Sequence, residues 1–166
     1  ADGTPYDLIF VFDSIGYNFE PSEIGAAYGL VQLDKLPDFN GQRRANWAQL
    51  DETVATLPGV GRSRTTEGAE TTWMRACFTV EADAPWTRSE LQDLLEARGV
   101  ATRMVWTGNV LRQPGFAGIE HRAPEGGLPN CDHLMDHALS LPIHHGMDSS
   151  HMTYICDQLR EVADLA

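Results

Sequence analysis

Lysine is nearly absent from this chain of 166 residues, in which Lys35 is the one example. Lysine and arginine together number 12 against 24 aspartates and glutamates, so the formal net charge is −12. Nucleic acids and anionic membrane surfaces bind through clustered cations, but the arginines here are scattered and the pair Arg43–Arg44 is too small to form a basic face. We therefore expect neither nucleic acid nor a membrane as a partner.

Signals of secretion are also missing. The chain has three cysteines and no CxxC pair, which indicates reduced thiols rather than a disulfide framework. No apolar run reaches the length that crosses a bilayer, and residues 1–8 lack the features of a signal peptide. We expect a cytoplasmic protein. Because the sequence does not begin with Met, we also expect that it was trimmed or begins inside a larger protein.

The sequence contains none of the short catalytic motifs that can be read without context. There is no HExxH, no phosphate-binding glycine loop and no GxSxG elbow. His133 and His137 have a helical spacing that could share a metal ion, but no third ligand follows, so we expect no metal site. Asp13 and Glu20 flank a turn and could act as an acid–base pair, although a solvated pair is the simpler interpretation.

Hydrophobic patterns in the first sixty residues predict a buried strand at 8–12 and then two helices. Ser22 is the expected N-cap of the first helix, whose apolar face would carry residues 24, 27, 28 and 31. Pro37 suits the first turn of a second helix, which Pro58 and Gly59 would end.

The remaining residues predict a small sheet packed with helices, in the α/β (α+β) class. Residues 71–81 alternate as a half-buried strand, Thr87 and Glu90 form a capping box, and Gly99 closes that helix. Strand, helix and strand would form a β-α-β unit, with a right-handed crossover if its strands are parallel. The further expectations are a strand at 100–106, loops at 61–70 and 107–129, a helix capped by Asn130 and running to Leu139, an edge strand at 141–143, and a final amphipathic helix capped by Asp148.

Three segments together resemble a known enzyme family. They are GYNFEPSEIGAAYGLVQLDKLPDFNGQRRANWAQL, GVATRMVWTGNVLRQPGF and LSLPIHHGMDSSHMTYICDQL. Their order and spacing are similar to those of the DegT/StrS-type pyridoxal-phosphate-dependent nucleotide-sugar enzymes, over nearly the whole chain. The segments YDLIFVFDSIGYN and TRMVWTGNVLRQP look closest to the 4-keto-6-deoxyhexose 3-dehydratases, whereas LSLPIHH is more like the sugar aminotransferases, so the subfamily stays open.

The resemblance implies a domain plan. Residues 1–20 would end a large domain with a strand and the GYN turn, residues 21–60 would form connecting helices, and residues 61–166 would form the small C-terminal domain of a fold-type I enzyme. The N-terminal domain that carries the Schiff-base lysine, or the histidine that replaces it in the 3-dehydratases, would be absent. Lys35 matches a surface lysine of the family and not the cofactor-binding lysine.

The resemblance also implies binding residues. Asn18 would reach the phosphate of pyridoxal phosphate or pyridoxamine phosphate held in the partner subunit, and Tyr17 would shape the same wall. The alternative for Asn18 is a purely structural turn, because asparagine tolerates positive φ. Family members commonly have Arg or Lys where this chain has Glu20, a carboxylate that would repel phosphate. Asn109, Arg112 and Gln113 would line the nucleotide-sugar side, or Arg112 would only brace its loop.

The function implied is that of the C-terminal part of a keto-sugar 3-dehydratase or aminotransferase of deoxysugar or lipopolysaccharide biosynthesis. Such a part would be inactive alone and would bind no cofactor by itself, whereas the parent enzyme would be a homodimer. Two alternatives stay open: a naturally short, non-catalytic homologue that binds a partner or completes a split enzyme, and an unrelated domain that binds a small ligand.

Overall fold

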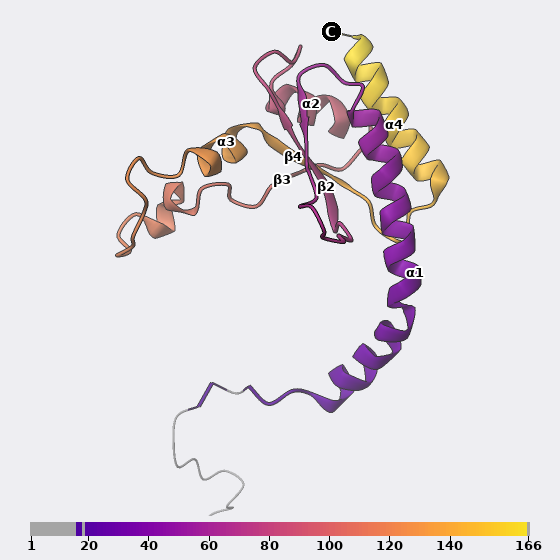
Figure 1. Ribbon diagram of the computed structural model, residues 1–166, viewed down its shortest axis with the longest axis vertical. Helices are drawn as coiled ribbons and strands as arrows, with labels where there is room; N and C mark the ends of the chain where they lie inside the picture. Colours follow the sequence, from indigo (N-terminus) through magenta and orange to yellow (C-terminus); the bar gives the residue numbers. More distant parts are fainter. Residues whose placement is uncertain (1–15, 18, 166) are drawn as a thin grey trace, which may run out of the picture. The chain divides into compact units, whose positions relative to one another are not determined.

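The computed structural model describes residues 16–17 and 19–165 (Figure 1). The chain divides into two units, Ala1–Leu36 and Pro37–Ala166, and each is described by itself. The strand predicted at 8–12 and the predicted cofactor ligand Asn18 lie outside the described residues. Within the described part of the chain, no helix is both long and apolar enough to cross a membrane.

One helix, α1 (Glu23–Val54), stands where the sequence predicted two, so the expectation that Pro37 begins a second helix was wrong. A proline inside a helix forfeits one backbone hydrogen bond, and the helix nevertheless continues past Pro37 to turns in which Leu50 and Val54 are buried. The start of the helix was predicted correctly, since the Gly25 N–H donates to Ser22 Oγ at 3.4 Å.

Four short strands form one sheet in the order β1-β2-β4-β3, and every neighbouring pair is antiparallel. Because β2 and β3 both run antiparallel to β4, they are parallel to each other with β4 between them. The predicted β-α-β unit is therefore present in split form, with α2 (Arg88–Glu96) as its helix. The strands are β1 (Val60–Arg62), β2 (Arg75–Val80), β3 (Arg103–Met104) and β4 (Ala138–Pro142).

The segment around β4 corrects three expectations. Helix α3 (Pro129–His137) has Leu128 at its N-cap position, so Asn130 lies inside the helix and Leu139 lies in the following strand. The strand is central rather than an edge strand, and its first four residues are buried. A short, mostly apolar run that is buried on both faces has no period that separates strand from helix, and Pro142 is tolerated because it is the last residue of β4. The predicted loop at 61–70 also begins with part of β1.

A single hydrophobic core joins the sheet to α2, to the second half of α1 and to the last helix, α4 (Ser149–Asp164). In β2 the alternation was predicted correctly, with Ala76, Phe78 and Val80 buried. The capping boxes at Thr87 and Asp148 are present as well. The predicted α+β class, a small sheet packed with helices and preceded by a long helix, is confirmed.

Candidate functional site

The candidate site begins in the loop that leaves β3 and enters the 3-10 turn η2 (Val110–Arg112). Asn109 caps this turn, because its Oδ1 accepts a hydrogen bond from the Leu111 N–H at 3.0 Å. Its Nδ2 donates to Asp132 Oδ1 at 2.7 Å, and the residue is only 4% exposed. Asn109 thus ties the loop to the first turn of α3.

Arg112 donates two hydrogen bonds to the carboxylate of Asp132. Its Nε lies 3.0 Å from Asp132 Oδ1, and one terminal nitrogen lies 2.9 Å from Oδ2. The hydrogen bonds from Arg112 first, and from Asn109 second, lower the pKa of Asp132 to about 2. The Arg112 side chain as a whole is still 63% exposed, which leaves it open to a ligand.

The structure brings together the three residues predicted to bind substrate. Gln113 completes the group through a long bond of 3.5 Å from its Nε2 to the Thr107 carbonyl, across the same loop. Asp132, which holds two of the three in place, was missed by the sequence analysis. Its single local signal is a carboxylate in the first turn of a helix, and such residues are too common to single out a site.

A cleft of about 290 Å³ adjoins this loop. Val105 lines it from the loop, Leu134 from α3 and Ala138 from β4, and the other lining residues lie in or next to β1 and β2. Cys77 lies in the lining, and burial raises the pKa of its thiol although Arg75 acts in the opposite direction. The lining is mostly apolar, which suits an uncharged part of a ligand better than a phosphate.

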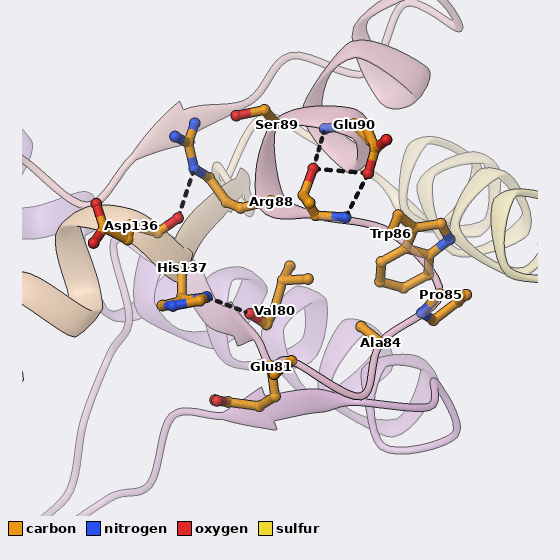
Figure 2. Close-up of a pocket in the computed structure, with 12 residues that line it drawn as sticks. Val80, Glu81, Ala84, Pro85, Trp86, Arg88, Ser89, Glu90, Asp136 and His137 are labelled. Atoms are coloured by element: carbon orange, nitrogen blue, oxygen red, sulfur yellow. Dashed lines mark hydrogen bonds between the residues drawn. The ribbon is translucent and has the colours of Figure 1, made fainter.

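A second cleft of about 330 Å³ lies between the end of β2 and the start of α2 (Figure 2). His137 Nδ1 donates to the Val80 carbonyl at 2.9 Å, and Arg88 Nε donates to the Asp136 carbonyl at 3.3 Å. The capping box of Thr87 and Glu90 occupies the N-terminus of α2. None of the predicted site residues lines this cleft.

Of the two histidines considered for a metal, His137 lines this second cleft. The rings of His133 and His137 stack with centroids 4.6 Å apart, and His133 Nε2 lies 3.5 Å from Glu81. Across the residues that the structure describes, no group of three or more His, Cys, Asp or Glu side chains is placed to hold a metal. The hydrogen bond from Thr79, ahead of the charge of His133, lowers the pKa of Glu81.

In the N-terminal unit the structure describes the neighbours of Asn18 but not Asn18 itself. Tyr17 and Phe19 are 86% and 88% exposed, and their rings stack with centroids 5.6 Å apart. The predicted role of Tyr17 and Asn18 at a cofactor phosphate therefore stays a prediction.

Asn46, in the RRAN segment of the first family-like stretch, has a structural role. Its Nδ2 donates to the carbonyls of His144 and Met147 at 3.0 and 3.1 Å, and it is 2% exposed. These bonds hold the turn between β4 and α4 against α1. His145, which follows His144 in that turn, stacks on Phe39 with ring centroids 3.8 Å apart, and burial lowers the pKa of the His145 ring.

Comparison with known proteins decides the family. Residues 5–160 match the model of the DegT/DnrJ/EryC1/StrS aminotransferase family. The chain belongs to this family. It is 31% identical over 156 residues to the dTDP-4-dehydro-2,6-dideoxy-D-glucose 3-dehydratase of Saccharopolyspora spinosa, covering 94% of this chain and 34% of that protein. It is 32% identical over 149 residues to the dTDP-3-amino-3,4,6-trideoxy-alpha-D-glucose transaminase of Streptomyces venezuelae, covering 90% of this chain and 38% of that protein.

A solved structure of a family member has the same fold. The GDP-4-keto-6-deoxy-D-mannose-3-dehydratase of E. coli, with bound hydrated PLP, superposes with a TM-score of 0.79 at 26% identity, covering 91% of this chain and 38% of that chain. The family predicted from the sequence is thus confirmed. The chain spans about a third of the length of the curated relatives that it matches.

Proposed function

We propose that this chain is the C-terminal part of a pyridoxal-phosphate- or pyridoxamine-phosphate-dependent nucleotide-sugar enzyme. The parent enzyme would act in the cytoplasm, in deoxysugar or lipopolysaccharide biosynthesis, on a keto-sugar linked to a nucleoside diphosphate. It would either transaminate the sugar or remove its C3 hydroxyl group. The observation that carries the proposal is the family match over residues 5–160, in which dehydratases and transaminases are similarly close relatives.

The described residues fit part of such an enzyme and not a complete cofactor site. When bound, the cofactor supplies an electron sink for carbanion formation, and a lysine or histidine beside it would transfer the proton. Lys35, the one lysine, lies exposed on α1 between Leu33 and Leu36. A Schiff base requires a desolvated amine, which an exposed lysine does not provide. We therefore propose that this chain is inactive alone and binds no cofactor by itself.

The loop clamped by Asp132 is the proposed substrate-binding element. Asn109 and Arg112 hold its shape through the shared carboxylate, and the exposed edge of the Arg112 guanidinium donates to a phosphate or hydroxyl oxygen of the nucleotide sugar. Gln113 lies beside it. In the parent homodimer, Tyr17 and Asn18 contact the cofactor phosphate bound by the partner subunit.

The first test uses the full-length protein that contains this chain, loaded with pyridoxal phosphate or pyridoxamine phosphate. Arg112→Ala is expected to raise the KM for the nucleotide sugar by roughly 10- to 100-fold, because a charged hydrogen bond is lost. Arg112→Lys keeps the charge but loses the paired donors of the guanidinium. We expect its KM to lie between those of the unmodified protein and Arg112→Ala. Arg122→Ala, an exposed arginine of the same long segment, is the matched control and is expected to change KM little.

Unchanged affinity and turnover in Arg112→Ala would remove the substrate role and leave Arg112 as a brace for its loop. Assays of dTDP- and GDP-linked 4-keto-6-deoxyhexoses, with and without an amino donor, separate transaminase from dehydratase. Turnover by the 166-residue chain alone would contradict the proposal that it is inactive alone. The upstream reading frame distinguishes a part of a larger enzyme from the alternative, a naturally short, non-catalytic homologue.

A further inference from the structure

Trp106 is unusually placed for a large apolar side chain. It is 87% exposed, more than any other large hydrophobic residue described in the unit Pro37–Ala166. Its φ is +51°, and it is the one residue other than glycine with positive φ in the described part of the chain. Burial would normally stabilise an indole, and left-handed backbone is costly for a bulky residue. Neither the hydrophobic effect nor backbone preference explains this conformation.

The turn that carries Trp106 is closed by one hydrogen bond and is fixed to α3 by the residues that follow it. The Gly108 N–H donates to the Val105 carbonyl at 3.2 Å, which closes the turn around the indole. Gly108 itself has φ +62° and packs so closely on α3 that an added Cβ would lie 2.3 Å from Met135 Cβ. One residue further, Asn109 bonds to Asp132 on the same helix. The exposed side chain is therefore attached to a rigid support.

Strain that the surrounding structure maintains is typical of sites that bind or react. The groups beside Trp106 limit what it can bind. Arg112 is paired with Asp132 and keeps one exposed polar edge, and Val105, the preceding residue, lines the mostly apolar cleft of about 290 Å³. Beside that polar edge, the turn presents the exposed flat face of an indole, which attracts planar rings.

We infer that Trp106 is a stacking platform for the base of the nucleotide sugar, an affinity-giving contact on the loop that carries Asn109 and Arg112. This inference rests on the proposed function. Stacking does not depend on base identity, because every base has a π-face. That property fits a family whose members act on dTDP-linked and GDP-linked sugars, as the names of the relatives state.

The test measures binding by calorimetry to the full-length protein, with dTDP, GDP and inorganic pyrophosphate as probes. Trp106→Gly removes the ring and suits left-handed backbone, so the variant keeps its fold. We expect it to weaken dTDP and GDP binding by roughly 5- to 150-fold, the range for loss of one base–aromatic stack, and to leave pyrophosphate binding unchanged. Trp106→Phe keeps an aromatic face, and we expect its affinity for dTDP and GDP to fall by about fivefold or less. Phe116→Ala, which removes a 42% exposed ring from the same segment, is the control and is expected to have no effect.

Each other outcome has a distinct meaning. Equal dTDP affinity in Trp106→Gly and the unmodified protein, with Arg112→Ala still weakened, overturns the stacking inference and leaves the proposed function standing. Equal losses of affinity for dTDP and pyrophosphate also overturn it, since the variant would then have disturbed the loop as a whole and not a contact between the ring and the base. A shift in oligomeric state with unchanged nucleotide affinity would instead assign Trp106 to a subunit contact. If the unmodified protein binds neither nucleotide, the proposed function itself fails.

Discussion

Asp132 shows how much of a site can depend on one residue that no local pattern marks. Its two oxygens receive Asn109 and Arg112, which lie 23 and 20 residues earlier in the chain. The family-like segment pointed to Asn109, Arg112 and Gln113, and the structure does bring them together. It could not point to their common partner, because pairing across such a distance is decided by where α3 lies on the sheet.

The low pKa of Asp132, about 2 against an ordinary value of 3.8, leads to a prediction about pH. A carboxyl group with a lowered pKa in the folded state stabilises the fold above its ordinary pKa, and that contribution is lost as the pH falls toward the folded value. We expect the stabilisation by this clamp to be complete above about pH 4 and to disappear as the pH approaches 2. An NMR titration of the Asp132 carboxyl checks this value.

In the same titration, Arg112→Ala should move the pKa of Asp132 up toward its ordinary value, because the hydrogen bonds from the guanidinium, which lower this pKa most, are gone. Arg122→Ala should leave it in place. A midpoint near 3.8 in the unmodified protein would show that the clamp is not formed in solution.

At the scale of elements, three helix starts were predictable because their capping signals are local. The caps at Ser22, Thr87 and Asp148 lie where the sequence placed them. Proline was the misleading signal, since Pro37 lies inside α1 and Pro142 ends a central strand. Proline disfavours helix and strand only at its own position, and packing elsewhere in the element can outweigh that local free-energy cost.

The join between α1 and the turn before α4 depends on the amide of Asn46, and this gives a second prediction. Asn46→Asp keeps the size of the side chain but removes both donors from the carbonyls of His144 and Met147. We expect the free energy of unfolding to fall by at least about 2 kcal/mol, because buried acceptors lose their partners next to a buried charge. Urea denaturation of the chain measures this change.

Asn130→Asp is the matched control, because it makes the same replacement at an exposed position in the first turn of α3. It should change the stability by no more than about 0.5 kcal/mol. If both variants unfold at the same urea concentration, the two hydrogen bonds of Asn46 contribute nothing measurable.

For the molecule as a whole, the decisive strand is β4. It pairs with β2 on one side and β3 on the other (Figure 1). Its residues Leu139 and Leu141 are fully buried. The sequence suggested a helix end and an edge strand here, because the five residues have no readable period. Strand order is a property of the assembled sheet and cannot be read from the strand itself.

The central position of β4 predicts that Leu141→Ala lowers the free energy of unfolding by roughly 2–5 kcal/mol, the range for a large side chain deleted from a packed core. Thermal or urea unfolding of the chain measures the loss. Leu134→Ala, at a side chain that is 40% exposed on α3, is the control and should cost less than about 1 kcal/mol. Similar losses for the two variants would contradict the central placement of β4.

The amino-acid sequence by itself determined the family, the α+β class, the capped helix starts and the half-buried face of β2. These features follow from neighbouring residues and from motif order, which are present before the chain folds. The tertiary structure alone decided that α1 is continuous, that β4 lies between β2 and β3, that Asp132 joins Asn109 to Arg112, and that Trp106 stands in solvent. Each of these depends on contacts between distant residues, whose free energy is gained only when the whole domain packs.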